Sequence, residues 1–218
     1  MANIAIDGPA GSGKSTVARM LAHKLGYVYI DTGAMYRALT LKAIENNIDM
    51  NDEEAITNIA NNTLIELKPG DTQEVYLDKR RVTEEIRRPD VSGYVSLVAQ
   101  YQRVREKLLI FQQEIALQNN VVMDGRDIGT RVLPNAEYKF FVDADIEART
   151  ERRYMELSAS GYDITRDAVR GMLLERDNQD TTRQFSPLAK AEDAILIDTT
   201  SLTPTEVIDK MYSIIKGD

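Results

Sequence analysis

The letters GPAGSGKS from Gly8 to Ser15 leave this 218-residue chain few ways to fold. They match the pattern GxxxxGK[ST] and lie between a short apolar run, Asn3–Asp7, and residues with helical apolar spacing that end at Gly26. In this context the glycines let successive backbone N–H groups point inward, and the dipole of the following helix adds partial positive charge. The segment is therefore predicted to be a loop that binds nucleotide phosphates.

Two side chains of this loop have distinct expected tasks. Lys14 is expected to reach the β- and γ-phosphates, and the Ser15 hydroxyl is expected to ligate Mg²⁺. The nucleotide is expected to contact nine consecutive residues: Gly8, Pro9, Ala10, Gly11, Ser12, Gly13, Lys14, Ser15 and Thr16.

Apolar runs of strand length recur along the chain and alternate with helical patterns. The five runs are Asn3–Asp7, Tyr27–Asp31, Val121–Asp124, Tyr138–Val142 and Ala194–Asp198. Strands separated by helices form parallel sheets that are covered on both faces. We therefore predict an α/β fold with a five-stranded, mostly parallel sheet. Its last helix is expected to begin at Pro204, with Thr203 as the cap and Glu206 completing the capping box.

Residues 63–83 depart from this alternation. Three short segments of strand length, Leu64–Leu67, Val75–Leu77 and Arg81–Thr83, are separated by the turn signals Pro69-Gly70-Asp71 and Asp78-Lys79. The pattern predicts a small antiparallel meander inserted into the α/β framework.

A phosphate loop of this kind also needs a carboxylate at the end of a neighbouring strand to hold magnesium. Asp7, Asp31, Asp143 and Asp198 all end apolar runs, so position alone does not choose among them and Asp124. Asp124 is the preferred magnesium residue because the next three residues, Gly-Arg-Asp, allow close backbone approach and add charged groups.

The composition excludes several classes of function. Lys and Arg number 27 against 35 Asp and Glu, a net charge of −8, which disfavours a nucleic-acid partner. With no Cys and a single His, His23, there are no disulfides, thiolate sites or His-rich zinc sites. Apolar stretches are far shorter than the roughly 18 residues of a membrane span. Near the N-terminus, Asp7 ends the first apolar run before it reaches the length of a signal-peptide core, so a cytoplasmic protein with no membrane partner is expected.

Arginines gather between residues 149 and 183, where Lys is absent. The group comprises Arg149, Arg152, Arg153, Arg166, Arg170, Arg176 and Arg183. Paired contacts to phosphate oxygens favour the planar guanidinium over the ammonium group. Ser158–Gly161 interrupts the helical pattern, which predicts a flap that closes arginines over phosphates. Some members are expected to form ordinary ion pairs instead, with Glu151, Glu156 and Glu175.

Four motifs in this order resemble the bacterial cytidylate kinase family over essentially the whole chain. They are Gly8–Ser15, Asp31–Arg37, Asp124–Thr130 and Glu175–Arg183, and the insert near residues 63–83 also fits. The resemblance implies a P-loop kinase fold and Mg²⁺-dependent transfer of the ATP γ-phosphate to CMP and dCMP. It further implies a monomer with one domain over residues 1–218. Within it, residues 32–102 would bind the monophosphate, with an insert at 63–89, and residues 149–165 would form a lid.

The resemblance also assigns roles to single residues. Ser96, Arg105 and Asp127 would recognise cytosine, since Asp127 can accept from its exocyclic amine whereas uracil presents a carbonyl there. Asp180 would contact the sugar hydroxyl. Arg149 and Arg153 correspond to lid residues that act with Lys14 and Asp124 in catalysis. The remaining residues around CMP would be Thr32, Arg37, Arg126, Arg176 and Arg183. Thr32 stands where family members often carry Ser.

Other interpretations of the same residues remain open. Ser96 could be a helix-surface serine, Asp180 a solvated loop carboxylate, and Arg105 a plain ion-pair residue. The chain could be another small-molecule P-loop kinase with a different phosphate acceptor. A nucleotide switch is less compatible, because the NKxD segment of guanine-specific switches is missing.

Overall fold

A five-stranded parallel sheet forms the centre of the molecule. The structure is a computed structural model that describes residues 2–68, 70 and 73–217. The strand order is β2-β6-β1-β7-β8. The strands are β1 (Asn3–Asp7), β2 (Val28–Asp31), β6 (Val121–Gly125), β7 (Tyr138–Asp143) and β8 (Ile195–Asp198). All five predicted strands are confirmed, with ends that differ by at most one residue. The register pairs Asp7 with Gly125 and Asp31 with Asp124, so the strand ends that carry carboxylates lie at one edge.

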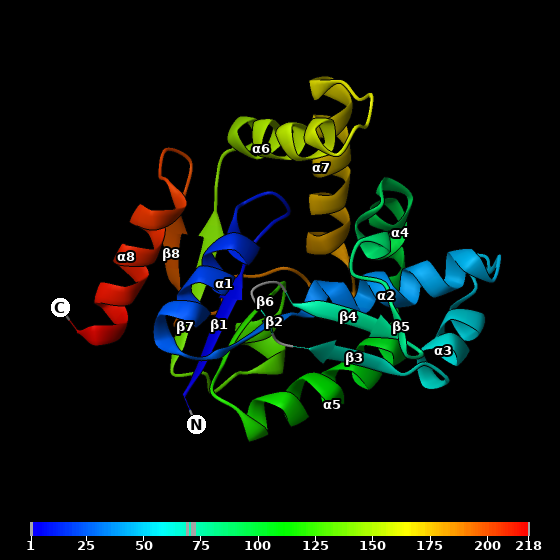
Figure 1. Ribbon diagram of the computed structural model, residues 1–218, viewed down its shortest axis with the longest axis horizontal. Helices are drawn as coiled ribbons and strands as arrows, with labels where there is room; N and C mark the ends of the chain where they lie inside the picture. The colour runs from blue at the N-terminus through cyan, green and yellow to red at the C-terminus, as the bar shows by residue number, and fades with distance from the viewer. Residues whose placement is uncertain (1, 69, 71–72, 218) are drawn as a thin grey trace.

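Helices cover both faces of this sheet (Figure 1). On one face, α1 (Lys14–Leu25) and α8 (Pro204–Lys216) bury their apolar sides against β1, β7 and β8. On the other, α2 (Thr32–Glu45), α4 (Pro89–Gln100) and α5 (Gln102–Gln118) form a larger core with β2 and β6, which α3 (Glu53–Asn61) extends. The predicted capping box of α8 is confirmed at Thr203 and Glu206. Within the described residues, no helix combines the length and apolar content that crossing a membrane requires.

The predicted antiparallel insert is confirmed as a three-stranded sheet. Its strands are β3 (Ile65–Lys68), β4 (Glu74–Leu77) and β5 (Arg80–Arg81), followed by the short helix η1 (Glu85–Arg87). The third strand was predicted at 81–83 but ends earlier, because the Thr83 hydroxyl takes the hydrogen bond from Val75 N at 3.0 Å. Pro69 and Asp71 of the predicted first turn lie outside the described residues.

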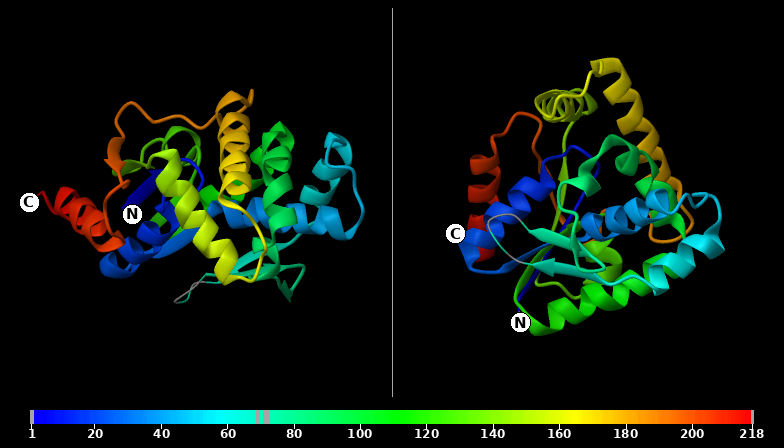
Figure 2. Two further views of the ribbon diagram at one scale, coloured as in Figure 1. Left: turned by 90° about the horizontal axis from the view of Figure 1, so that it is seen from above. Right: turned by 45° about the vertical axis from the view of Figure 1, so that its right-hand side comes forward.

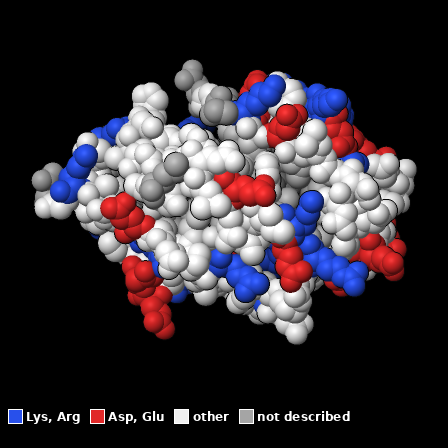
Figure 3. Space-filling model, turned by 90° about the horizontal axis from the view of Figure 1, so that it is seen from below, with Lys and Arg blue, Asp and Glu red and all other residues white. Residues whose placement is uncertain are grey.

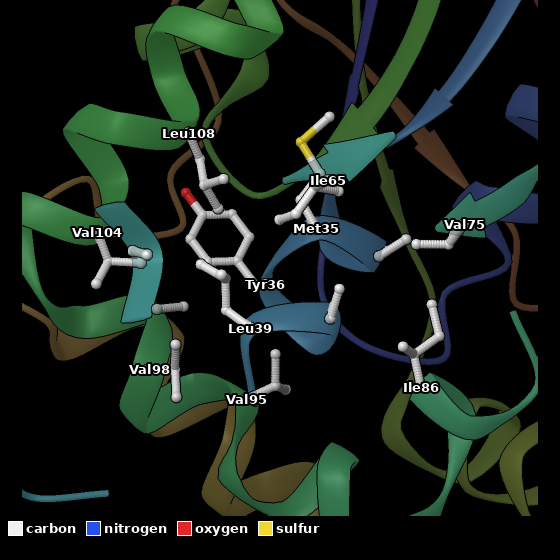
Figure 4. Packing of buried hydrophobic residues seen from close by; sticks show 14 of the residues in the cluster. Met35, Tyr36, Leu39, Ile65, Val75, Ile86, Val95, Val98, Val104 and Leu108 are labelled. Atoms are coloured by element: carbon white, nitrogen blue, oxygen red, sulfur yellow. The ribbon is translucent and has the colours of Figure 1, made fainter. Parts of the chain in front are cut away.

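The insert packs against the helices that carry the acceptor motif. Figure 4 shows Met35, Tyr36 and Leu39 of α2 between side chains of the insert and side chains of α4 and α5. The labelled neighbours are Ile65, Val75, Ile86, Val95, Val98, Val104 and Leu108. All ten are buried, so the start of α2 is held from two sides.

Two helices stand at the carboxyl edge of the sheet, above the phosphate loop (Figures 1 and 2). They are α6 (Ile146–Ala159) and α7 (Arg166–Thr182), capped by the side chains of Asp145 and Thr165. The predicted interruption of the helical pattern is confirmed, since α6 ends within Ser158–Gly161. Leu157, Val169 and Leu173 form a small separate core with Ala10 of the loop.

Candidate active site

A cavity of about 660 Å³ opens at the carboxyl edge of the sheet. The start of α1 forms one end, and residues of α4, α5 and the segment after β6 form the other, with α6 and α7 above. Volumes of this size accommodate small organic ligands. Seven of the nine predicted nucleotide contacts, Ala10 to Thr16, line it directly.

The phosphate loop has the backbone that its glycines predict. Gly8, Gly11 and Gly13 all have positive φ, and Lys14 begins α1. The Lys14 ammonium donates to Pro9 O at 2.7 Å and lies buried across the loop. Burial, followed by the charge of Arg126, lowers the pKa of Lys14 to about 7. An anion bound beside it would reverse this shift by favouring the charged form.

Gly8 and Pro9 do not line the cavity, and Gly8 instead fits against β7. A Cβ on Gly8, which has φ +152°, would lie 2.0 Å from the backbone oxygen of Val142. Gly8→Ala is therefore expected to lower the free energy of unfolding by more than about 3 kcal/mol, because backbone must move to relieve the overlap. Chemical denaturation measures this. Gly26→Ala is the control: its φ is also positive, but no atom lies within 4 Å of its Cβ position. Equal losses for both variants would contradict the packing argument.

Asp124 is the strand-end carboxylate that meets the phosphate loop. Its oxygens accept from the Ser15 hydroxyl at 2.7 Å and from the Tyr29 hydroxyl at 2.9 Å. Burial, followed by the charge of Asp31, raises the pKa of Asp124 to about 6. The other strand-end carboxylates are used elsewhere: Asp7, Asp143 and Asp198 each accept from nearby backbone N–H groups, and Asp31 caps α2. Tyr29 was not predicted as a residue of the site. The sequence could have indicated it only through its position, since it lies two residues before Asp31 and therefore on the same face of the strand.

At the start of α2, Asp31 and its neighbours form a compact group. The Arg37 guanidinium pairs with the Asp31 carboxylate at 2.7 Å, and the Thr32 hydroxyl donates to Asp124 O at 2.8 Å. Gln73, just before β4 of the insert, accepts from Asp31 N at 3.1 Å. Thr32 and Arg37 both line the cavity, and the hydroxyl of Thr32 ties α2 to β6.

At the far end of the cavity, Arg105 and Asp127 form a buried pair with N–O separation 2.6 Å. Arg105 also donates to Ala99 O at 2.9 Å, and its guanidinium lies 5.3 Å from the centre of the Tyr36 ring. Three separate contacts thus fix the guanidinium that holds Asp127. Both side chains line the cavity. Arg105 is therefore an ion-pair residue, as one interpretation of the sequence held, and also a residue of the candidate site.

Asp180 joins α7 to this end of the cavity. Its carboxylate contacts Arg126 at 2.7 Å and lies 3.4 Å from both the Ser96 hydroxyl and Arg183. Burial opposes its ionisation, but Arg126, Arg176 and Arg183 hold the pKa of Asp180 below its ordinary value. The alternative placements of Ser96 on a helix surface and of Asp180 in a solvated loop are wrong, since both are buried.

Positive charge accumulates in the cavity although the chain is acidic. Nine Lys or Arg and five Asp or Glu line it, whereas basic and acidic side chains are interspersed on the face drawn in Figure 3. Among the described residues, four cavity arginines have a buried nitrogen without a hydrogen-bond partner: Arg37, Arg105, Arg176 and Arg183. Burial and neighbouring guanidiniums lower the pKa of Arg176 and of Arg183 to about 10. Unpaired buried donors and crowded cations both favour an anionic ligand.

The arginines of α6 divide between the cavity and the protein interior. Arg153 lines the cavity and pairs with Glu156 at 2.7 Å. Arg149 does not line it: its guanidinium donates to Ala144 O and Ala10 O and pairs with Asp177. Arg152, which was predicted only as a member of the arginine group and with no role of its own, lines the cavity and donates to Thr199. Helical spacing places residues 149, 152 and 153 on one side of α6. Only the packing of α6 against the phosphate loop determines that Arg152 and Arg153 line the cavity and that Arg149 does not.

Two of the three expected ion pairs are confirmed. Arg166 pairs with Glu151 at the exposed surface, and Arg153 pairs with Glu156. Arg170 forms a pair that was not predicted, with Glu147. The expected pair with Glu175 is wrong, because its neighbour Arg176 turns into the cavity and Glu175 accepts from Gln179 instead. His23 is exposed on the last turn of α1, as predicted.

Comparison with known proteins gives consistent results. A family model described as cytidylate kinase matches residues 4–217. A cytidylate kinase of Caldicellulosiruptor bescii is 51% identical over 99% of this chain and 98% of its own, and one of Bacillus cereus is 50% identical over 99% and 96%.

Solved structures agree at the level of the fold. A shikimate kinase from Bacteroides thetaiotaomicron superposes with a TM-score of 0.51 at 10% identity, covering 99% of this chain and 98% of that one. An uncharacterised protein from Eubacterium ventriosum gives 0.56 at 14% identity, with both chains covered completely. The predicted P-loop kinase fold is thereby confirmed.

Proposed function

The chain belongs to the cytidylate kinase family, and from this premise we propose which of its residues carry the phosphorylation of CMP and dCMP by ATP. One observation supports the assignment above the others. A single cavity has a phosphate loop at one end, the buried Arg105–Asp127 pair at the other, and arginines with unused donors between them. Two anionic nucleotides can therefore meet there with their phosphates together.

At the donor end, Ala10 to Thr16 bind the ATP phosphates through backbone N–H groups, with Gly8 and Pro9 supporting the loop from behind. Lys14 leaves Pro9 O and contacts the β- and γ-phosphates. Beyond the loop, Arg152 and Thr199 line the wall next to Leu202, Pro204 and Val207, an apolar surface suited to the adenine ring.

At the acceptor end, Asp127 accepts from the cytosine amine, with Arg105 and Ser96 beside it. Arg37, Arg126, Arg176 and Arg183 hold the CMP phosphate, and Asp180 contacts the sugar. A phosphate oxygen of CMP then forms a bond to the γ-phosphorus as the bond to the β,γ-bridging oxygen breaks, and ADP leaves with that electron pair. Lys14 and the arginines stabilise the charge that spreads over the transferring group.

Mg²⁺ fits the group formed by Ser15 and Asp124. Both supply oxygen, the ligand that Mg²⁺ prefers, and the raised pKa of Asp124 indicates a buried carboxylate short of positive charge. Ser15 and Asp124 would hold the ion together with substrate phosphates and water. When bound, it supplies charge neutralisation between the β- and γ-phosphates.

Three further assignments follow the family. We treat residues 1–218 as one domain, in which 32–102 with the insert 63–89 binds CMP and 149–165 is the lid. Arg153 already lines the cavity, and Arg149 would join it only by exchanging its contact with Asp177 for a phosphate. By the same family resemblance, the chain acts on ATP and CMP or dCMP as a monomer in the cytoplasm. Only the compartment has support from the composition, since a chain without Cys needs no oxidising environment.

A substrate panel tests this function. We expect rapid ADP release in a coupled assay with ATP, Mg²⁺ and either CMP or dCMP. UMP should be much slower, because the carboxylate of Asp127 repels the carbonyl that uracil presents at the amine position. AMP and GMP should be inactive, because a two-ring purine does not place its exocyclic group where cytosine places its amine. Preference for an acceptor without a cytosine base would instead identify another small-molecule P-loop kinase.

A further inference from the structure

The segment that follows β6 carries the proposed cytosine contact in an unusual backbone setting. After Gly125, Arg126 and Asp127 lead into η2 (Ile128–Val132), a single π-helical turn in which Val132 N donates to Asp127 O at 3.1 Å and Leu133 N to Ile128 O at 2.7 Å. Asp127 is therefore the N-cap residue of this turn. An aspartate at that position ordinarily accepts from the N–H of the second or third residue of its own helix.

Asp127 does not do this. Its carboxylate makes no cap hydrogen bond and pairs with Arg105 at 2.6 Å in the cavity wall. The first two N–H groups of the turn are bound by a different residue, and the second of them, that of Gly129, is one that an N-cap side chain can accept from. Asp7, the last residue of β1, accepts from Ile128 N with one carboxylate oxygen and from Gly129 N with the other, both at 2.8 Å.

We propose that Asp7 is a positioning residue for acceptor specificity: by capping η2 from the neighbouring strand, it leaves the Asp127 carboxylate free to recognise the cytosine amine. The inference rests on the proposed role of Asp127 and adds a residue that does not line the cavity. Without Asp7, the buried N–H groups of Ile128 and Gly129 lack partners. Asp127 occupies the N-cap position, from which a side chain can accept from the second N–H of the turn, that of Gly129, so it is the side chain expected to compete for it. Accepting this hydrogen bond would withdraw that carboxylate from the base.

The surroundings of Asp7 support this arrangement. Asp7 is buried, and burial raises its pKa to about 6, so its carboxylate is held there at a cost in desolvation. The register pairs Asp7 with Gly125 on one side and with Phe141 on the other, which fixes the carboxylate between two strands. A Cβ on Gly129 would lie 3.4 Å from the nearer Asp7 oxygen, so the turn fits closely over it.

Asp7→Asn is the primary test. Asparagine keeps the shape and one acceptor but turns its amide toward the second N–H, and it removes a charge whose burial is unfavourable, so the fold is expected to survive. We expect KM for CMP to rise about tenfold to a hundredfold, the range for one lost hydrogen bond to a charged group. The CMP-over-UMP ratio in kcat/KM should fall by a similar factor. KM for ATP should change by less than about threefold, although Asp7 also senses the charge of Lys14.

A double-mutant cycle separates this role from a general structural one. When Asp127 is already alanine, adding Asp7→Asn should change KM for CMP by less than about twofold. Asp7→Ala is the second variant. Alone, it should raise KM for CMP more than Asp7→Asn does, and it too should have little further effect when Asp127 is already alanine. Asp143→Asn is the matched control, since Asp143 also ends a central strand and accepts from one backbone N–H, that of Ala144. It should remain within about twofold of the wild type.

Three results would overturn the inference: unchanged discrimination in Asp7→Asn, equal rises in KM for ATP and CMP, or effects of Asp7 and Asp127 that simply add. Failure of the proposed function is recognised separately, because the wild-type enzyme would then show no cytosine preference before any substitution is made.

Discussion

Lys14→Ala is expected to reduce kcat by at least about 10³-fold while the protein remains folded. Lys14 is the one ammonium group among the cavity-lining residues of the described chain, and it begins the helix whose N-terminus faces the phosphates. Removing a preorganised cation from a phosphoryl-transfer site costs orders of magnitude in rate, because the charge that spreads over the transferring group is no longer stabilised. The coupled ADP assay with saturating CMP measures the loss.

The fold should tolerate this change. Burial already lowers the pKa of Lys14 to about 7, so the buried charge does not favour the folded state, and the main interaction that the substitution removes is the hydrogen bond to Pro9 O. The expected cost is about 1 kcal/mol in the free energy of unfolding. Lys24→Ala, at an exposed lysine of the same helix that pairs with Asp209, is the control and should retain full activity. A normal rate for Lys14→Ala would contradict the role of the phosphate loop.

The framework of the molecule could be predicted from the sequence because its signals are local. Strand-length apolar runs, the glycine loop and the capping signal at Thr203 each depend on a few adjacent residues, and all are present in the structure. The third strand of the insert was displaced, because a side chain, Thr83, replaced a backbone partner in the ladder. Such a replacement leaves no periodic signal.

Most residues that line the cavity could be predicted from the sequence, but the orientations of their side chains could not. Arg149, Arg152 and Arg153 share one side of α6, yet only Arg152 and Arg153 line the cavity, since Arg149 is drawn to Asp177 of α7 and to Ala10 O. Tyr29 reaches Asp124 through the pairing of β2 with β6, and these residues are 95 positions apart. Contacts of this kind depend on strand order, which local patterns do not specify.

The same limit applies to the role of Asp7. A carboxylate at the end of β1 could be predicted as a magnesium ligand on position alone. In the structure, this carboxylate instead accepts hydrogen bonds from Ile128 N and Gly129 N of η2, which are 121 and 122 positions away in the sequence. The phosphate loop and the proposed cytosine contact thus begin at adjacent ends of β1 and β6, two strands that are paired in register.

Asp127→Asn is expected to lower kcat/KM for CMP by about 10²-fold or more and to leave KM for ATP within about twofold. The substitution keeps an oxygen for Arg105, whose contacts to Ala99 O and to the Tyr36 ring also remain, so the pocket should keep its shape. What changes is the group that meets the base. A carboxylate only accepts, whereas an amide also donates and can therefore meet the uracil carbonyl. Because sites built to hydrogen-bond one group reject analogues that leave it unpaired, the CMP-over-UMP ratio should fall further than kcat/KM for CMP alone.

Steady-state kinetics with CMP, UMP and ATP varied in turn measure these three quantities. Asp209→Asn, an exposed aspartate that pairs with Lys24, is the matched control and should leave all of them unchanged. Since Asp127 lies at the far end of the cavity from the phosphate loop, damage confined to the acceptor is the signature of a base contact. If KM for ATP and KM for CMP rose by the same factor, Asp127 would not be the residue that recognises the base. The buried carboxylate at this position would then have no proposed role.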